Sequence, residues 1–206
     1  MHAQYGAIVK MERPCAKACG MHAIHSDEYG RADINYDKCV SCGMCLVNCP
    51  FGAIADKGQI FQTILAMKAG TRVYAAVAPA FIGQFGPKLT PERFREAMKE
   101  LGFADVVEVA AGADLCTIQE AKDFLEEVPD KIPFMGTSCC PSWSVMAKTE
   151  FPQYANCISM ALTPMVFTGR MIKKADPGCK VAFIGPCAAK NLRQAAEVCE
   201  AMLILY

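Results

Sequence analysis

The chain lacks an excess of one charge, a long apolar run and an apparent leader segment. Lysine plus arginine equal aspartate plus glutamate at 21 each, so neither a basic surface for nucleic acid nor an acidic tail is expected. Its apolar runs, such as residues 73–81, are too short to cross a bilayer. We therefore expect no nucleic-acid partner and no membrane partner.

Cysteine, by contrast, is abundant, because the chain has thirteen of them. Without an N-terminal signal sequence, this number indicates a reducing cytoplasm, where thiols serve metals and redox chemistry rather than disulfides. The 206 residues are 53% apolar, which suffices for one large domain or for a small and a medium one. We expect a globular cytoplasmic protein.

Four cysteines followed by a proline have the ligand spacing of bacterial ferredoxins that carry 4Fe-4S clusters. They are Cys39, Cys42, Cys45 and Cys49, and Pro50 follows. A tight loop of this spacing points several thiolates at one cubane while backbone N–H groups face its sulfides, and Gly43 adds backbone freedom. A disulfide framework or a zinc site fits four such closely spaced cysteines poorly. The run predicts an iron–sulfur cluster.

The segment 15–24 repeats in the segment 45–54, since both read Cys-x3-Cys followed four residues later by Ala-Ile. In two-cluster ferredoxins the fourth cysteine of each run binds the cluster of the other run. By that rule Cys19 completes the site of the 39–45 cysteines, and Cys49 joins Cys15 at a second site. Residues 1–14 hold no cysteine for that second site. We expect a missing N-terminal segment; the alternative is a degenerate site without its cluster.

After residue 56 the pattern changes to alternating strands and helices. We expect strands at 72–79, 106–109, 132–135 and 180–184, and helices at 60–69, 90–101, 118–128, 142–148 and 162–174. Such alternation predicts an α/β domain with a largely parallel sheet. The expected organisation is an α+β ferredoxin-like cluster domain, residues 1–56, followed by an incomplete α/β domain, residues 57–206. Ligands of parallel sheets gather at the carboxyl ends of the strands.

Two cysteine motifs follow expected strands, at residues 137–143 (Thr-Ser-Cys-Cys-Pro-Ser-Trp) and 185–190 (Gly-Pro-Cys-Ala-Ala-Lys). Taken alone, either motif is equally compatible with buried, unreactive cysteines. The cluster-binding run in the same chain favours a redox centre.

In this order, the ferredoxin run and these two motifs resemble the large subunit of the iron-only (FeFe) hydrogenases, over roughly residues 13–190. The Phe-Ile-Gly-Pro-Cys form of the last motif is similar to a less studied branch of that family. The resemblance implies an active-site 4Fe-4S cubane joined through a cysteine sulfur to a two-iron centre with CO, cyanide and a dithiolate bridge. It also implies H2 and protons as substrates and a soluble electron carrier such as ferredoxin as partner.

Carried over residue by residue, the resemblance implies that Cys140 and Cys187 bind the cubane. Cys139 is then the proton donor and acceptor beside the dithiolate bridge. Lys190 is expected to hold an iron-bound cyanide, which suits an ammonium directed at an anion in a dry pocket. These four residues form the expected active site.

Further matching positions imply a proton route through Glu120, Ser159 and Asp123. The first and last of these are three residues apart, which places them on one face of a helix. For Asp123 a solvated acidic face is an equally acceptable interpretation. Ala78 and Pro79 are expected to line the pocket of the two-iron centre.

The chain also departs from the family pattern. Ala80, Gly185 and Ala189 stand where the family has a serine, a methionine and a serine, and Arg193 replaces a glutamate. The resemblance ends after residue 190, and the family's third cysteine motif is absent, so we expect an incomplete fragment.

Two rival functions remain open. A non-catalytic 4Fe-4S electron-transfer or sensory protein would explain the absent motif, whereas Cys139, Lys190 and Glu120 favour hydrogenase ancestry. A ferredoxin-linked reductase of other chemistry is a third possibility, which no nucleotide or flavin motif supports.

Overall fold

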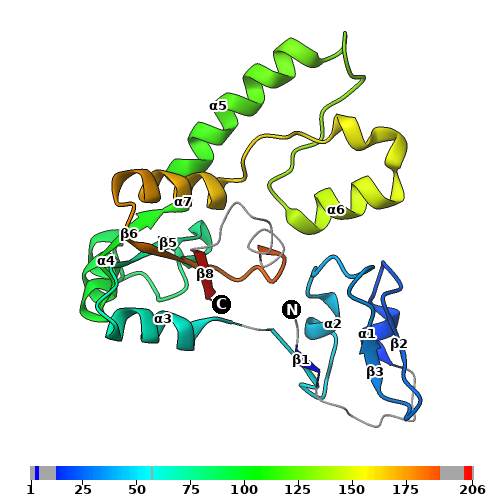
Figure 1. Cartoon of the computed structure of the whole chain (residues 1–206), viewed down its shortest axis with the longest axis horizontal. Helices are drawn as coiled ribbons and strands as arrows, with labels where there is room; N and C mark the ends of the chain where they lie inside the picture. Colours follow the sequence, from blue (N-terminus) through cyan, green and yellow to red (C-terminus); the bar gives the residue numbers. More distant parts are fainter. Residues whose placement is uncertain (1–2, 5–12, 57, 191–201, 206) are drawn as a thin grey trace.

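The computed structural model describes residues 3–4, 13–56, 58–190 and 202–205. Figure 1 shows two parts, one formed mainly by residues 13–56 and the other mainly by residues 58–190. We call residues 13–56, together with the strand at 3–4, the cluster part, and residues 58–190, together with the strand at 202–205, the sheet part.

The cluster part is built from two short antiparallel strand pairs and two one-turn helices. β1 pairs with β4, and β2 pairs with β3 in the register Ile24↔Ile34. The helices α1 and α2 lie against each other. The elements are β1 (Ala3–Gln4), α1 (Pro14–Lys17), β2 (Ile24–Ser26), β3 (Ala32–Ile34), α2 (Met44–Val47) and β4 (Ile54–Ala55).

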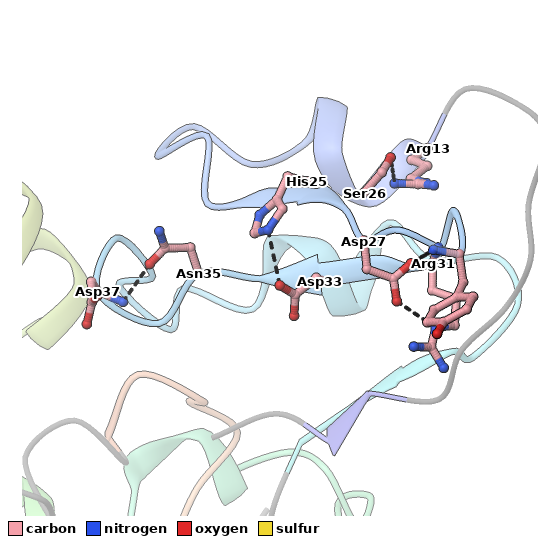
Figure 2. A network of polar contacts seen from close by, with 9 residues as sticks. Arg13, His25, Ser26, Asp27, Arg31, Asp33, Asn35 and Asp37 are labelled. Carbon is pink, nitrogen blue, oxygen red and sulfur yellow. Dashed lines mark hydrogen bonds and ion pairs between the residues drawn. The ribbon is translucent and has the colours of Figure 1, made fainter.

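A network of polar contacts holds the β2–β3 hairpin (Figure 2). Asp27 accepts hydrogen bonds from the backbone N–H groups of Tyr29 and Arg31 and also pairs with the Arg31 guanidinium. Arg13, the residue before α1, donates to the hydroxyl of Ser26 and to the backbone of the same turn. Because Arg13 belongs to the start of α1, the network fixes that helix, with Cys15, on the hairpin.

The sheet part has a four-stranded, fully parallel sheet in the order β6-β5-β7-β8. The predicted α/β arrangement with a largely parallel sheet is therefore confirmed. The strands are β5 (Val73–Val77), β6 (Asp105–Glu108), β7 (Lys180–Ile184) and β8 (Met202–Leu205). The helices are α3 (Ile60–Lys68), η1 (Pro79–Phe81), α4 (Pro91–Glu100), α5 (Val109–Glu127), α6 (Pro141–Glu150), η2 (Pro152–Cys157) and α7 (Pro164–Ala175).

The central strand β5 is buried on both faces, as parallel sheets require. Val73, Ala75 and Val77 pack in one core cluster with Phe94 of α4, while Ala76 belongs to the opposite cluster. That second cluster contains Val109 of α5, buried residues of α7 and Phe183 of β7. The layers on the two faces hold the strand ends in fixed relative positions.

Two local expectations were wrong. Residues 132–135 are not a strand; next to them only Gly136 forms an isolated parallel bridge, with Ile158. Pro133 offers no N–H to a ladder, which explains why this apolar run does not extend the sheet.

The helix expected at 118–128 begins at Val109, a residue we had expected to end a strand. Gly112 lies inside α5 where α7 packs against it. A Cβ at Gly112 would lie 2.1 Å from Oγ1 of Thr168. The glycine thus permits close helix packing and does not end the helix. Within the described ranges, no helix is long and apolar enough to span a membrane.

Candidate functional site

The sequence repeat has a structural counterpart in the cluster part. Cys15 and Cys45 each occupy the second position of a one-turn helix, α1 and α2. Both side chains are buried, at 7% and 8% exposure, and share a small core with Ile54. Equivalent cysteines of the two repeats therefore lie in equivalent places.

The later cysteine of each repeat accepts a hydrogen bond from the backbone four residues on. Ala23 N donates to Cys19 Sγ at 3.3 Å, and Ala53 N donates to Cys49 Sγ at 3.4 Å. Burial raises the pKa of the Cys49 thiol, but the N–H groups of residues 51–54 outweigh it and hold that pKa below its usual range. Backbone amides directed at sulfur suit a thiolate that binds iron.

A left-handed residue precedes each of these donors. His22 has φ 48° in the first repeat, and Gly52 has φ 61° at the matching position of the second. A non-glycine residue in this region costs backbone energy, and such strain collects at ligand-binding loops. The turn geometry is thus preserved even where the sequence does not supply glycine.

The loop at residues 39–45 gathers three thiols. Ser41, with φ 51°, donates its N–H to Cys39 Sγ at 3.4 Å, and Gly43 has φ 81°. Burial and the nearby thiolates of Cys39 and Cys42 raise the pKa of Cys45 to about 11. The thiolate forms of these residues repel one another, and the iron of a cluster would offset that repulsion.

Among the described residues, no group of three or more His, Cys, Asp or Glu side chains could hold a single metal ion. The cysteines of a cubane bind different iron atoms and therefore lie farther apart than the ligands of one zinc ion.

In the sheet part, Cys139 and Cys140 lie exposed on the loop before α6, with Cys140 at the N-cap position. Trp143 Nε1 donates to the carbonyl of Thr137 at 3.0 Å, so the indole fastens the loop to the helix. Ser138 Oγ donates to the carbonyl of Ala161 at 3.2 Å. The two exposed thiols stand on a loop that is tied down on both sides.

The second cysteine motif follows β7 and meets the first. Lys190 Nζ donates to the backbone carbonyl of Cys139 at 2.8 Å, across 51 sequence positions. Lys190 N donates to the carbonyl of Cys187 at 3.1 Å, so a single turn carries both residues. The fold thus brings the two motifs together although the strand expected before the first is absent.

The ends of β5 and β7 meet beside these motifs. Ala78 N donates to the carbonyl of Ile184 at 2.8 Å, and Pro79 begins η1 directly after it. A Cβ at Gly185 would lie 2.8 Å from the Cβ of Ala78. A larger residue at 185 would therefore require the neighbouring segment at Ala78 to shift in this structure.

Ser159 is buried, at 7% exposure, and lies beside the segment that leads to Cys139. Its N–H donates to the carbonyl of Gly136 at 2.8 Å, and its hydroxyl accepts from Ala161 N at 3.1 Å. Together with Asp123 it lines a cavity of about 440 Å³ between α5 and residues 156–162.

Glu120 is not among the described residues that line this cavity. Burial raises the pKa of the Cys116 thiol, and the carboxylate of Glu120, one turn later on α5, raises that pKa further. The structure thus brings Asp123 and Ser159 to one cavity and turns Glu120 toward another neighbour. A proton route through Glu120, Ser159 and Cys139 stays a prediction.

Two further residues of α5 that line the cavity, Gln119 and Glu127, were not predicted from the sequence. With Asp123 they recur every four residues, a spacing that places them on one helix face and could have identified them. Gln119 Nε2 donates to Asp123 Oδ1 at 2.8 Å.

Comparison with known proteins gives two family matches. Residues 71–201 match the family described as iron only hydrogenase large subunit, C-terminal domain, and residues 9–60 match the LdpA Fe-S cluster-binding domain.

Among individual relatives, the chain is 28% identical over 177 residues to the NADP-reducing hydrogenase subunit HndD of Solidesulfovibrio fructosivorans, covering 74% of this chain and 30% of that protein. It is 32% identical over 160 residues to iron hydrogenase 1 of Clostridium pasteurianum, covering 69% and 28%. It is 22% identical over 164 residues to the cytosolic Fe-S cluster assembly factor NAR1 of Candida dubliniensis, covering 73% and 27%. The chain therefore spans less than a third of the length of these relatives.

Proposed function

Because the chain belongs to the iron-only hydrogenase large-subunit family, we propose that it serves the reversible reduction of protons to H2. Its cofactors include 4Fe-4S clusters, in keeping with the cluster-binding match over residues 9–60. In this proposal residues 1–56 form the electron-entry domain and residues 57–206 the first part of the catalytic domain. The observation that carries it is the contact between Lys190 and the Cys139 backbone, which joins two cysteine motifs that an electron carrier alone would not need.

The residues of the sheet part suit the group that the family carries. Cys140, at the start of α6, and Cys187, after β7, are available thiols on adjoining segments, and would hold the active-site cubane. When bound, the two-iron centre supplies the metal chemistry that joins protons and electrons into H2. Lys190 offers an ammonium to an anionic ligand in this place.

Cys139 is exposed and free of metal-ligand duty in this assignment, which leaves its thiol to hold and release a proton. The cavity lined by Asp123 and Ser159, which Cys139 itself does not line, offers carboxylate and hydroxyl groups for proton supply. Glu120 belongs to this proposal as a donor one helical turn from Asp123. Residues Ala78 and Pro79 would line the pocket at the end of β5.

Electrons would enter through the cluster part, with Cys19, Cys39, Cys42 and Cys45 around one cluster. Cys15 and Cys49 would serve a second site. A soluble electron carrier such as ferredoxin is the proposed donor. We also propose a cytoplasmic location, since thirteen cysteines need a reducing compartment.

A non-catalytic role in iron–sulfur chemistry is the second candidate. It is favoured by the similarity to a protein named as a cluster assembly factor, which covers 73% of this chain. Such a protein would bind 4Fe-4S clusters without ever carrying the two-iron centre.

The deciding experiment measures iron, acid-labile sulfide and EPR spectra of the anaerobically reconstituted chain, and H2 evolution after supply of a synthetic two-iron cofactor. If the chain is a hydrogenase, the sheet part should bind iron and the chain should evolve H2. Cys139→Ser should abolish this H2 evolution. Cys116→Ser, which changes a buried cysteine away from the motifs, should retain it. Iron confined to the cluster part of the wild-type chain, together with no H2, would instead support the non-catalytic candidate.

A further inference from the structure

The cluster part and the sheet part meet at a side-chain hydrogen bond. Ser142 Oγ donates to the backbone carbonyl of Val40 at 2.6 Å, although 102 positions separate the two residues. Val40 is buried at 6% exposure, and Ser142 is half-buried. A buried carbonyl needs a donor, and here the donor comes from the other part of the chain.

A second contact lies beside the first. The Cβ of Ala188 is 3.7 Å from the place that a Cβ at Gly43 would occupy, which is ordinary van der Waals distance. Gly43 and Val40 belong to the loop that carries Cys39 and Cys42. Figure 1 shows α6 on the side of the cluster part that carries α2.

All four residues in these contacts are neighbours of candidate ligands. Val40 follows Cys39 and Gly43 follows Cys42, while Ala188 follows Cys187 and Ser142 stands two residues after Cys140. The contact surface therefore consists of the two sets of ligand-bearing loops themselves.

The hydroxyl of Ser142 has a local alternative that it does not use. Serine in the first turn of a helix commonly bonds to the backbone of that helix. Ser142 is the second residue of α6, and the side chain of the N-cap residue, Cys140, makes no capping hydrogen bond. The hydroxyl turns outward to the Val40 carbonyl instead, so its role lies at the contact between the two parts.

We propose that Ser142 is a positioning residue: its hydroxyl holds loop 39–43 against the segments of Cys140 and Cys187, and so fixes the spacing between two sets of cluster ligands. Only one consequence of this proposal rests on the proposed function, namely that electron supply to the sheet part depends on that spacing. The docking itself needs cluster binding and no catalysis.

The test is hydrogen–deuterium exchange, with mass spectrometry, on the whole chain loaded with clusters. Ser142→Ala removes the donor, and the amides of residues 40–43 should exchange about five-fold faster, the effect of one hydrogen bond. Ser142→Thr keeps a hydroxyl and should restore protection. Thr149→Ala is the matched control, since Thr149 Oγ1 donates only within α6, to the Val145 carbonyl.

A second readout is the midpoint potential of the cluster in loop 39–45, followed by EPR. Undocking admits water, which stabilises the more negatively charged reduced cluster, so Ser142→Ala should give a more positive potential than wild type or Ser142→Thr. Unchanged loop exchange and potential in Ser142→Ala would overturn the proposal. Equal acceleration over residues 143–150 would overturn it too, because Ser142 would then only stabilise α6. Absence of H2 turnover would contradict the proposed function and leave both readouts interpretable.

Discussion

The cluster part and the sheet part assemble their cysteines in different ways. In the first, Cys39, Cys42 and Cys45 lie on one short loop, and backbone N–H groups of the same loop reach their sulfurs. In the second, the contact between Lys190 and Cys139 spans 51 positions and depends on β7, α6 and the helices between them. The spacing of the three loop cysteines is set by one stretch of backbone, whereas the meeting of the two later motifs depends on the sheet and its helices.

The largest expected effect separates the two iron sites. Cys45→Ser should remove one cubane's worth of iron from the cluster part and leave iron in the sheet part, since each site has its own ligands. Cys187→Ser should do the reverse. Iron analysis and EPR after reconstitution measure both, with Cys116→Ser as the control that keeps all iron. Loss of both sites in either variant would mean that the parts do not assemble independently.

Overpacking α5 against α7 should disturb only the sheet part. Gly112→Val places a side chain 2.1 Å from Thr168 Oγ1 and should lower the free energy of unfolding by about 3 kcal/mol. Chemical denaturation followed by circular dichroism measures this loss. Gly178→Ala is the control, because the nearest atom to its added Cβ is 3.8 Å away. A Gly112→Val chain as stable as the control would show that the two helices can separate freely.

The left-handed turns of the repeat offer a matched pair within the cluster part. Gly52→Ala forces a Cβ into φ 61° and should destabilise the bound cluster by about 1 kcal/mol, seen as faster iron release to a chelator. His22→Gly should relieve the same cost at φ 48° and slow the release from the site of Cys19. Gly20→Ala has open space and should change nothing. Equal release from all three variants would show that these turns carry no strain.

The smallest effect concerns the ion pair of Arg95 with Asp105, at the start of β6. Arg95 lowers the pKa of Asp105 below its ordinary value of 3.8, so the pair stabilises the fold above that value and is lost as the pH falls below it. Asp105→Asn should lower Tm by less than about 2 °C at pH 7, because the pair is solvated. The difference from wild type should begin to shrink below about pH 4 and disappear only well below that, as the pH approaches the lowered folded-state pKa of Asp105. A difference that does not shrink as the pH falls would assign the stabilisation to another contact.

Several elements were predictable because their signals are local. The strand at 180–184 has the expected bounds, and the helix at 91–100 follows its Thr90 cap, whose hydroxyl accepts from Arg93 N. The apolar run at 132–135 was misread because its composition suits a strand while Pro133 interrupts the ladder. The helix of residues 109–127 was placed too late, because the fit of Gly112 against Thr168 lies outside any local pattern.

The candidate site also has features that local sequence signals predict and features that they do not. The spacing of Cys39, Cys42, Cys45 and Cys49 was enough by itself to predict a cluster-binding loop, since ligands a few residues apart are held by one stretch of backbone. The alternation of strands and helices determined a parallel sheet, since such elements bury both of its faces.

Only the tertiary structure decided which loops meet. The hydrogen bond from Ser142 to Val40, the contact of Lys190 with Cys139, and the cavity that Asp123 shares with Ser159 join segments distant in sequence. No periodicity or spacing encodes such contacts, because they arise from the packing of helices on the sheet and of one part of the chain against the other.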